Sequence, residues 1–434
     1  MTIKYTFYDS MKNERGKMIQ TIRGTKDLLP DVINQWHFVE SQFRKVSSNY
    51  GYSEIRTPIF EKTEVFSRSI GEETDIVNKE MYTFTDKGGE SVTLRPEMTA
   101  ALVRAVIQNS LLQQSSTLKL WYFGPFFRYE RPQKGRLRQF HQYGAECLLS
   151  PYPESDAEVV FLANDIIKSI GINDYALFYN TLGNAESRKN YRNELLKYFR
   201  SVKDNLSTDS LNRLENNPLR ILDSKDERDI DIVRNAPLIT ESLDNESLDY
   251  FRSFEALIEN SGIKLVHNPR LVRGLDYYNH IVFEFQNSSL GAQDSFGGGG
   301  RYNDLFEQLG SKQSVPAVGF ALGVERMLLI LEQNESLKLQ ENIPDVFIIA
   351  TSTDLLKQSR DIAAILRARG LQVIVDLQRR SVKAQMREAN RNGAKFTIIV
   401  GDNEIARNIV IVKEMATGSQ SECPLANIVH YPFS

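Results

Sequence analysis

An arginine, an aspartate and two adjacent tyrosines stand directly before a predicted strand in the second half of the chain. The segment reads LVRGLDYY over 271–278 and is followed by NHIVFEF, whose aromatic and β-branched content is typical of a strand. Arg273, Asp276, Tyr277 and Tyr278 are therefore expected at the mouth of a sheet. Residues of these types either close off a surface loop or bind something small and polar, and the segment alone leaves both alternatives open.

A second group of charged side chains lies on a predicted long hairpin over 126–146. Alternate residues of a strand share a face, so Arg128 and Glu130 are expected to point together, as are Gln142 and Glu146 on the returning strand. A guanidinium fork can bind two phosphate oxygens at once, and the basic connecting loop could close over such a group. The alternative is a solvated charged hairpin, and this segment does not decide between the two.

The segment TLRPEMTAALVR, over 93–104, places an acid and a hydroxyl group at the start of a predicted helix. Glu97 and Thr99 both follow a proline at this start. Glu97 could cap the helix electrostatically, or it could face the ammonium group of a ligand. Capping is the better interpretation of this segment when it is read by itself.

Arg326 stands among apolar residues of a predicted helix in GFALGVERMLL, over 319–329. A buried unpaired charge is costly, so this arginine needs a neighbouring carboxylate or a ligand such as a triphosphate or a purine ring. The earlier segment SFGGGGRYND has four glycines before Arg301 and Tyr302 but lacks the ending of a P-loop. Such glycines can let the backbone approach a ligand closely. Together, the separated arginines, acids and tyrosines predict one pocket for a nucleotide beside a small polar zwitterion.

The elements that must position these residues form two predicted domains. Residues 19–335 mix strands and helices without regular alternation, which favours an α+β domain with a mixed, mainly antiparallel sheet. Within it, residues 184–260 are amphipathic, charged and nearly free of strand patterns, and we expect a helical insertion there. After a polar linker, strands and helices alternate over 345–434, which predicts a small parallel α/β domain. Residues 1–18 are expected to form a separate N-terminal extension.

Composition and charge argue against several classes of protein. The net charge of −3 gives no general support for nucleic-acid binding, so any such binding must depend on local patches. The chain has no run of 18 or more apolar residues, so we expect no membrane span. The two cysteines, Cys147 and Cys423, and the five scattered histidines lack metal-ligand spacing. We therefore expect no protein-bound structural metal, and a reduced, cytoplasmic compartment.

Over about residues 19–415, several motifs in order resemble those of histidyl-tRNA synthetases, which are class II aminoacyl-tRNA synthetases. YSEIRTPIF resembles the dimer-interface motif of that class, FRYERPQKGRLRQFHQ the second motif and GFALGVERMLL the third. LVRGLDYY resembles a segment particular to the histidine enzymes. The resemblance implies a homodimeric ligase that uses ATP with Mg²⁺ to form histidyl-adenylate and then charges the 3′ end of tRNA(His). The domain at 345–434 would then be an anticodon-binding domain.

The resemblance also implies a role for each candidate residue. The catalytic residues would be Arg128, Arg273 and Arg326. The ATP-binding residues would be Arg128, Glu130, Phe140, which would stack on adenine, and Arg326. The histidine-binding residues would be Glu97, Met98, Thr99, Arg128, Gln142, Glu146, Arg273, Tyr277, Tyr278 and Tyr302. Arg273 would lie at the α-phosphate, and Glu146 with the three tyrosines at the imidazole end. Met98 is a departure, because many bacterial members have glycine at this position.

A basic segment of the predicted C-terminal domain could contact tRNA. Residues 376–395 contain six basic residues and two acidic ones. Arg380, Lys383, Arg387 and Arg391 follow helical spacing, so we expect them to form a stripe. Without the resemblance a solvated helix face would be the first interpretation, and with it an RNA-contacting face is favoured.

Two other functions remain as alternatives. One is the non-catalytic, synthetase-like regulatory subunit of ATP phosphoribosyltransferase, which typically lacks the C-terminal domain and the catalytic arginines that this chain keeps. The other is a class II synthetase for another amino acid. The segment LVRGLDYY argues against this alternative, because it resembles a segment particular to the histidine enzymes. Two ends of the chain depart from the family pattern: residues 1–17 precede its usual start, and ANIVHYPFS lacks an obvious closing helix.

Overall fold

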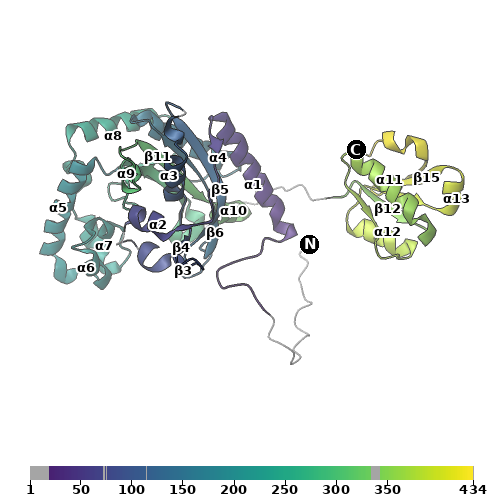
Figure 1. The fold of residues 1–434 in the computed structure, drawn as a ribbon, viewed down its shortest axis with the longest axis horizontal. Helices are drawn as coiled ribbons and strands as arrows, with labels where there is room; N and C mark the ends of the chain where they lie inside the picture. The colour runs from purple at the N-terminus through teal and green to yellow at the C-terminus, as the bar shows by residue number, and fades with distance from the viewer. Residues whose placement is uncertain (1–18, 72–73, 75, 114, 334–342, 434) are drawn as a thin grey trace, which may run out of the picture. The chain divides into compact units, whose positions relative to one another are not determined.

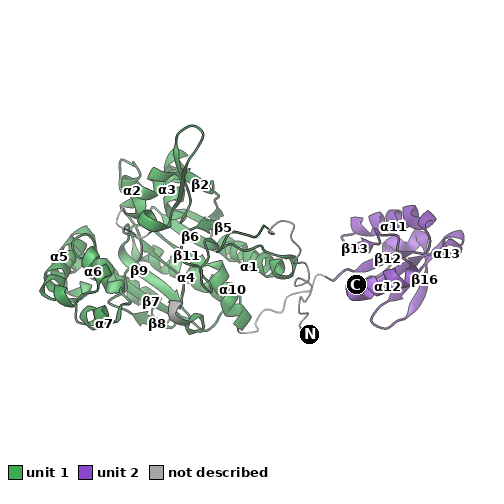
Figure 2. Ribbon diagram, turned by 90° about the horizontal axis from the view of Figure 1, so that it is seen from below, with its two compact units in different colours: residues 1–337 green, residues 338–434 purple. Residues whose placement is uncertain are grey.

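The computed structural model of the chain describes residues 19–71, 74, 76–113, 115–333 and 343–433. The chain divides into two compact units, residues 1–337 and 338–434, which are coloured separately in Figure 2. The expected extension over 1–18 and most of the expected polar linker lie outside the described residues. Among the helices that the structure does describe, none combines the length and the apolar character that crossing a membrane requires.

An eight-stranded sheet is the centre of the first unit (Figure 1). The strands of this unit are β1 (Ser53–Glu54), β2 (Phe60–Lys62), β3 (Tyr82–Thr85), β4 (Ser91–Leu94), β5 (Leu118–Phe127), β6 (Gln139–Leu148), β7 (Ala176–Thr181), β8 (Leu265–His267), β9 (Asn279–Gln286), β10 (Ser295–Arg301) and β11 (Ala317–Gly323). Their order in the large sheet is β1-β5-β6-β11-β10-β9-β7-β8, and β2-β4-β3 form a smaller sheet. In the large sheet, β1 pairs with β5 and β7 with β8 in parallel, and the other pairs are antiparallel. The predicted mixed, mainly antiparallel sheet is therefore confirmed.

The helices of the first unit cover both faces of this sheet. They are α1 (Pro30–Asn49), α2 (Thr63–Ile70), α3 (Thr99–Gln108), α4 (Pro153–Ser169), α5 (Ala185–Ser201), α6 (Thr208–Arg213), α7 (Glu227–Arg234), α8 (Asn245–Ile258), α9 (Leu305–Gln308) and α10 (Val324–Gln333). Apolar residues of α1, α4, α8 and α10 form one buried core with one face of the sheet. On the other face, α3 and α9 form a second core with the tyrosines Tyr122, Tyr277, Tyr278 and Tyr302. Because this second face contains polar aromatic side chains, it is the face on which a ligand site can form.

The predicted long hairpin is present, but its strands end earlier than expected. β5 and β6 pair antiparallel over their whole length, from Leu118 opposite Leu148 to Phe127 opposite Gln139. Arg128 and Glu130 therefore lie in the connecting loop, so strand alternation does not determine where they point. On β6 the alternation does hold, because Tyr143, Ala145 and Cys147 enter the first core while the intervening side chains face the other side.

Helices fill the expected insertion, but the structure differs from the prediction just before the insertion and at its end. Residues of α5, of α7 and of the segments around them, from Tyr191 to Ile239, form a small core of their own. α8 instead packs its apolar residues into the main core with α4, so the separately packed part ends before α8. A strand that the sequence analysis did not identify, β7, precedes the insertion and pairs with β9.

The second unit is an α/β domain with a five-stranded sheet. Its strands are β12 (Val346–Ala350), β13 (Val373–Val375), β14 (Phe396–Val400), β15 (Ile409–Glu414) and β16 (Gln420–Pro424), and its helices are α11 (Leu356–Ala368), α12 (Val382–Arg391) and α13 (Asp402–Ala406). The three strands that the sequence analysis expected, β12, β13 and β14, are parallel, and β15 and β16 are antiparallel additions that it did not predict. After β16, the segment at the end forms a 3₁₀ helix, Leu425–His430. α11 and α12 pack on opposite faces, because alternate residues of β12 enter two different cores.

Candidate active site

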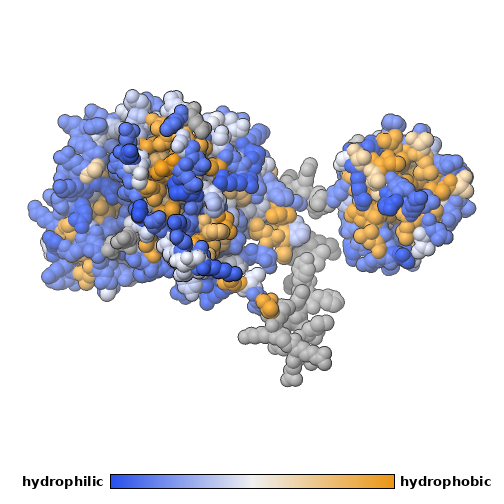
Figure 3. Space-filling view, viewed as in Figure 1, coloured by the Kyte–Doolittle hydropathy of each residue, from blue (hydrophilic) through white to orange (hydrophobic). Residues whose placement is uncertain are grey.

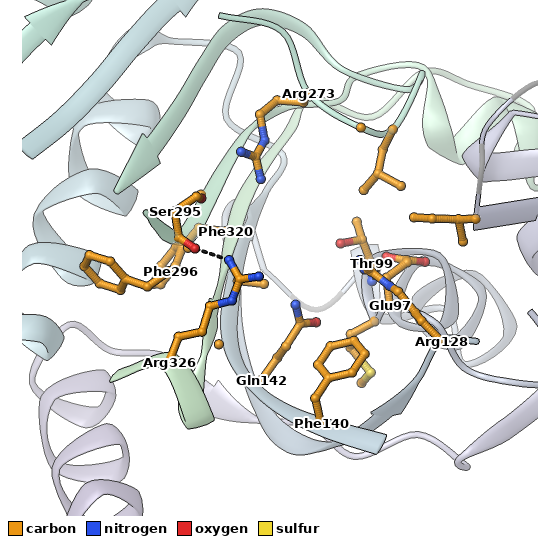
Figure 4. Close-up of a pocket in the computed structure, with 18 of the residues that line it drawn as sticks. Glu97, Thr99, Arg128, Phe140, Gln142, Arg273, Ser295, Phe296, Phe320 and Arg326 are labelled. Atoms are coloured by element: carbon orange, nitrogen blue, oxygen red, sulfur yellow. Dashed lines mark hydrogen bonds between the residues drawn. The ribbon is translucent and has the colours of Figure 1, made fainter. Parts of the chain in front are cut away.

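A cavity of about 250 Å³ lies on the α3 face of the large sheet. Figure 4 shows that Arg128, Arg273 and Arg326 approach it from different sides, with Phe140 and Gln142 between them. The structure brings together in its lining every residue that the sequence analysis assigned to catalysis, to histidine or to ATP, namely Glu97, Met98, Thr99, Arg128, Glu130, Phe140, Gln142, Glu146, Arg273, Tyr277, Tyr278, Tyr302 and Arg326. These residues come from positions more than 200 apart in the sequence, so their convergence is a result of the fold.

Glu146 lies at the closed end of the cavity. Its side chain is almost completely buried, and its two carboxylate oxygens accept hydrogen bonds from Thr99 Oγ1 (2.9 Å) and Tyr302 Oη (2.6 Å). Burial raises the pKa of Glu146 to about 8, against the opposing effect of these two hydrogen bonds. A side chain at Gly319 on β11 would overlap this carboxylate, so glycine is required there.

Glu97 serves as the cap that the sequence suggested and also lines the cavity. Its carboxylate accepts from the backbone N–H groups of Thr99 (2.6 Å) and Ala100 (3.0 Å) at the start of α3. The side chain is buried, and burial raises its pKa despite those two hydrogen bonds. The two interpretations are therefore compatible, because a fixed carboxylate at the wall of the cavity can still face a cation.

Three tyrosines surround the closed end of the cavity. The rings of Tyr277 and Tyr278 lie 4.7 Å apart, and Tyr277 meets Tyr302 edge to face at 5.7 Å. All three rings are buried in the second core, which holds their orientation. Together with Glu146 they form a closed end that is apolar in its walls and polar at a few fixed points, which suits a small aromatic group with N–H donors.

Arg128 is held at the wall of the cavity, on the side where Figure 4 draws Glu97 and Thr99. Its Nε donates to the carbonyl oxygen of Pro96 (2.9 Å), and its guanidinium carbon lies 5.3 Å from the centre of the Phe140 ring. Glu130 is buried nearby and forms an ion pair with Arg136. A positive charge beside an aromatic face is the arrangement that a phosphate joined to a planar base requires.

Arg326 has two backbone partners among the described residues, in addition to any side chain that the sequence analysis considered. Its Nε donates to the carbonyl oxygen of Gly135 (3.1 Å), and its NH1 donates to that of Ser295, the bond drawn in Figure 4. These bonds join α10 to the β5–β6 loop and to the start of β10. They also fix the guanidinium at the wall of the cavity, where its charge can act on an anionic ligand.

Arg273 enters the cavity from the segment before β9. Its NH1 forms an ion pair with Glu284 of β9, whereas its Nε is buried without a hydrogen-bond partner among the described residues. Burial alone would lower the pKa of Arg273, but the Glu284 carboxylate raises it above the ordinary value. A Cβ atom on Gly298 would lie about 3.0 Å from NH1 of this arginine. The glycine run of β10 therefore leaves room for the Arg273 side chain, and it also lines the cavity.

Three further charged or polar residues line the cavity and were given no specific role in the sequence analysis. Tyr122 points from β5 toward Gly144, whose missing side chain leaves room for the ring. Glu325 accepts from the backbone N–H of His141 (2.9 Å) and contacts its imidazole, so it holds β6 against α10. Arg136 forms the ion pair with Glu130. Strand alternation predicted the face of Gln142 and Glu146, and the same rule applied to β5 would have identified Tyr122.

The basic stripe predicted in the second unit is only partly formed. α12 begins at Val382, so Arg380 lies before the helix, where it forms ion pairs with Asp376 and Glu388. Arg391 also pairs with Glu388. Lys383 and Arg387 are exposed on the helix, one turn apart. The expected four-residue stripe is therefore wrong for Arg380, which stabilises the loop before α12 instead.

This arrangement can position a nucleotide and a small amino acid, and it can stabilise negative charge between them. Fixed guanidinium groups meet the needs of phosphoryl chemistry, in which charge develops on phosphate oxygens. The described residues contain no group of three or more His, Cys, Asp or Glu side chains arranged to hold a metal ion. The orientation of these arginines would determine how well the site stabilises that charge.

Comparisons with known proteins agree with this chemistry. The sequence model described as histidyl-tRNA synthetase matches residues 24–327, and that described as anticodon binding domain matches residues 345–431. The chain is 47% identical to the histidine–tRNA ligase of Fervidobacterium nodosum, over 93% of this chain and 96% of that protein. It is 46% identical to the histidine–tRNA ligase of Halothermothrix orenii, over 95% and 98%.

Solved structures give the same result. The crystal structure of apo S. aureus histidyl-tRNA synthetase is similar, with a TM-score of 0.81 and 38% identity, over 96% of this chain and 100% of that one. A Bacillus halodurans structure, described as an ATP phosphoribosyltransferase regulatory subunit/histidyl-tRNA synthetase, has 23% identity and a TM-score of 0.62 over 89% of this chain and 99% of that one, and it supports the fold alone. From the match of both domains and the level of identity, the chain belongs to the histidyl-tRNA synthetase family.

Proposed function

We propose that the cavity of the first unit activates L-histidine with ATP and that the histidyl group is then transferred to the 3′ end of tRNA(His). Family membership makes the chain an ATP-dependent histidine–tRNA ligase. The observation that carries the residue-level proposal is the convergence of four arginines, four carboxylates and four tyrosines on one cavity. The regulatory-subunit alternative is not favoured, since the chain keeps both the arginines and the second unit.

The imidazole of histidine would occupy the closed end of the cavity. Glu146 would accept from a ring N–H, and Tyr302 would hold that carboxylate in place through its 2.6 Å hydrogen bond. Tyr277 and Tyr278 would enclose the ring. The ammonium group would lie by Glu97 and Thr99, near Gln142, with Met98 as part of the wall.

ATP would occupy the open part of the cavity, with adenine against Phe140 and the phosphates among the arginines. The histidine carboxylate attacks the α-phosphorus, and pyrophosphate leaves. Charge that grows on the α-phosphate oxygens would be stabilised by Arg128 and Arg273, and Arg326 would bind the nucleotide near Glu130. No protein group has to move a proton in this step, because the attacking carboxylate is already ionised.

Magnesium would enter with the nucleotide. Mg²⁺ is usually bound through substrate phosphates and few protein carboxylates, so it would not need a dedicated cluster of protein ligands. It would neutralise the leaving pyrophosphate, and the protein would contribute the arrangement of arginines around it.

We also propose that the protein is a homodimer through the region of β2–β4. Ile59, Phe60 and Phe84 expose 44, 53 and 49% of their surface there, which is unusual for large apolar side chains in a single copy. Figure 3 shows hydrophobic residues gathered on the first unit around the place where Figure 1 draws α3. The segment YSEIRTPIF, which resembles the dimer-interface motif, leads into β2.

The proposed reaction is tested by ATP–pyrophosphate exchange over a panel of amino acids. We expect histidine to support exchange. With amino acids that lack its ring N–H groups, the exchange efficiency should be about 10⁴–10⁵-fold lower, because such an analogue leaves the polar groups of the site without hydrogen-bond partners. Charging of tRNA(His) should require the same amino acid. Exchange with another amino acid at a comparable rate would reject the proposed substrate.

Glu146→Gln is expected to raise the KM for histidine more than the KM for ATP. A carboxylate accepts a hydrogen bond more strongly than an amide oxygen, whereas in the proposed arrangement the phosphates would not contact Glu146. Exchange kinetics with each substrate varied separately measure this difference. A defect confined to ATP would assign Glu146 to the wrong ligand.

The same variant should also change how stability depends on pH. Because the pKa of Glu146 is raised from 4.5 to about 8 in the folded protein, the folded state keeps a proton that the unfolded chain releases between these values. The stabilisation from the neutral carboxyl is thus complete below about pH 4.5 and lost as pH rises through about 8. Glutamine stays neutral at every pH. As pH rises from about 4.5 to about 8, the Tm of the ligand-free variant should therefore increase relative to that of the ligand-free parent. Glu194→Gln, at an exposed position of α5, is the control.

A further inference from the structure

The segment 271–278, which carries Arg273, Tyr277 and Tyr278 into the cavity, has no regular secondary structure. It therefore lacks the ladder of backbone hydrogen bonds that would hold a strand in place. Its position must depend on other groups that bind its carbonyl oxygens and side chains. Several of these groups come from the helical insertion, which otherwise packs around its own core.

Arg188 of α5 binds the part of the segment that carries the tyrosines. Its NH1 donates to the carbonyl oxygen of Tyr278 (2.7 Å), and its NH2 donates to that of Asp276 (3.1 Å). One guanidinium fork thus holds the carbonyl oxygens of the residues before and after Tyr277. Burial lowers the pKa of Arg188, opposed by the carboxylate of Asp276.

Arg220 binds the part of the segment that carries the cavity arginine. It lies in the 3₁₀ helix Pro218–Asp223 of the insertion, and its NH1 donates to the carbonyl oxygen of Arg273 (3.3 Å). The same guanidinium lies 4.0 Å from the Asp223 carboxylate. Asp223 in turn interacts electrostatically with Arg273 and Glu284, so the insertion also faces the charged groups of the cavity wall.

Asp276 connects the insertion to the other side of the segment. Its Oδ1 accepts from Asn217 Nδ2 (2.9 Å), and its backbone N–H donates to the carbonyl oxygen of Ile70 at the end of α2 (3.2 Å). A side chain on Gly71, whose φ is +99°, would come within 2.6 Å of the Asp276 carboxylate. Val272 packs against both the insertion core and the core below the cavity.

We propose that the helical insertion positions the segment 271–278 for adenylation, with Arg188 acting on the tyrosines of the histidine end and Arg220 acting on Arg273 at the phosphate end. Both are positioning residues, since neither lines the cavity. A consequence is that anything that displaces the insertion would change amino-acid activation. This inference rests on the proposed roles of Arg273, Tyr277 and Tyr278.

Because the two arginines hold different ends of the segment, their removal should have different kinetic effects. We expect Arg188→Ala to raise the KM for histidine by about 10- to 10²-fold with a smaller change for ATP, since misplacement by about 1 Å can cost about 10²-fold. We expect Arg220→Ala to lower kcat with a smaller change in the KM for histidine, because Arg273 would act on charge that develops in the transition state.

Arg192→Ala is the matched control. It lies one turn further along α5, and its guanidinium also donates to two backbone carbonyl oxygens, those of Glu215 (2.6 Å) and Asn216 (3.4 Å), but both belong to the insertion itself. Its exchange kinetics should remain within about twofold of the parent even if it lowers Tm, because neither of its two carbonyl partners belongs to the segment 271–278. A purely structural role for Arg188 would make the two variants behave alike.

The measurement is histidine-dependent pyrophosphate exchange by the full-length protein, with KM and kcat for each substrate and Tm for each variant. If Arg188→Ala does not fold, Arg188→Lys replaces it; lysine keeps the charge and can reach one carbonyl but not two, so its KM should lie between parent and alanine. The inference is overturned if Arg188 variants match Arg192→Ala while Arg273→Ala is inactive. If Arg273→Ala is itself fully active, the proposed site is wrong rather than the positioning.

Discussion

Replacing Arg273 with alanine should lower histidine-dependent pyrophosphate exchange by about 10²–10³-fold, the usual loss when one preorganised donor to a developing negative charge is removed. Arg273 is suited to this role because its guanidinium is oriented by Glu284 and lines the cavity, while its Nε has no hydrogen-bond partner among the described residues. Because the guanidinium group lines the cavity, a phosphate oxygen there could accept a hydrogen bond from it. Arg273→Lys should also be poor, since an ammonium group cannot reproduce the fork.

Two companion variants separate the loss of positive charge from other effects. Arg273→Ala leaves the Glu284 carboxylate on β9 without its cation, so Arg273→Ala/Glu284→Gln tests whether this unpaired negative charge alone repels ATP. We expect the double variant to stay nearly as inactive as the single one. Arg252→Ala, an exposed arginine on α8, controls for the removal of a charge and should leave exchange unchanged. Exchange at the parental rate by Arg273→Ala, with its Tm retained, would show that the α-phosphate is stabilised by other groups.

The sequence predicted best those features that depend on neighbouring residues, such as the face of a strand on which a side chain lies. The face of β6 that presents Gln142 and Glu146 follows from a period of two, and that prediction is confirmed. The same rule was wrong for Arg128 and Glu130, because β5 ends at Phe127 and the loop that follows obeys no period. The identity of the cavity-lining residues came from several motifs in order, and the structure brings all of them together.

Contacts between segments far apart in the sequence could not be predicted in this way. Arg326 donates hydrogen bonds to two carbonyl oxygens of residues 191 and 31 positions away, which the composition of its own helix could not predict. Arg301, which ends the glycine run of β10, forms a completely buried ion pair with Asp156 of α4. Its guanidinium nitrogen lies 2.5 Å from the carboxylate oxygen, although the two residues are 145 positions apart in the sequence. The bonds from the insertion to segment 271–278 are of the same kind, because amphipathic helices show which side is buried but not which loop their polar side chains reach.

Ending the chain after residue 335 is expected to leave pyrophosphate exchange largely intact while lowering tRNA charging by about 10³-fold, the lower limit for the difference between specific and non-specific nucleic-acid binding. All residues that line the cavity lie between positions 76 and 326, and each unit has hydrophobic cores of its own. Exchange needs only histidine and ATP, whereas charging also needs the tRNA held in register. Loss of exchange together with charging would contradict this division and would mean that the second unit supports the first.

A charge variant of the intact chain tests which face of the second unit binds tRNA. Lys383→Gln/Arg387→Gln removes the two exposed charges of α12 and leaves Arg380 with Asp376, so the loop before the helix is preserved. Each side chain that neutralises a phosphate adds about one to the magnitude of the slope of log binding constant against log salt concentration. The slope for tRNA binding by this variant should therefore be smaller in magnitude by about two. Its pyrophosphate exchange should be unchanged. Lys357→Gln/Arg360→Gln on α11 is the matched control, because α11 packs on the opposite face of the same sheet. If both pairs weaken tRNA binding equally, the effect is one of net charge, and α12 does not provide the RNA-binding face.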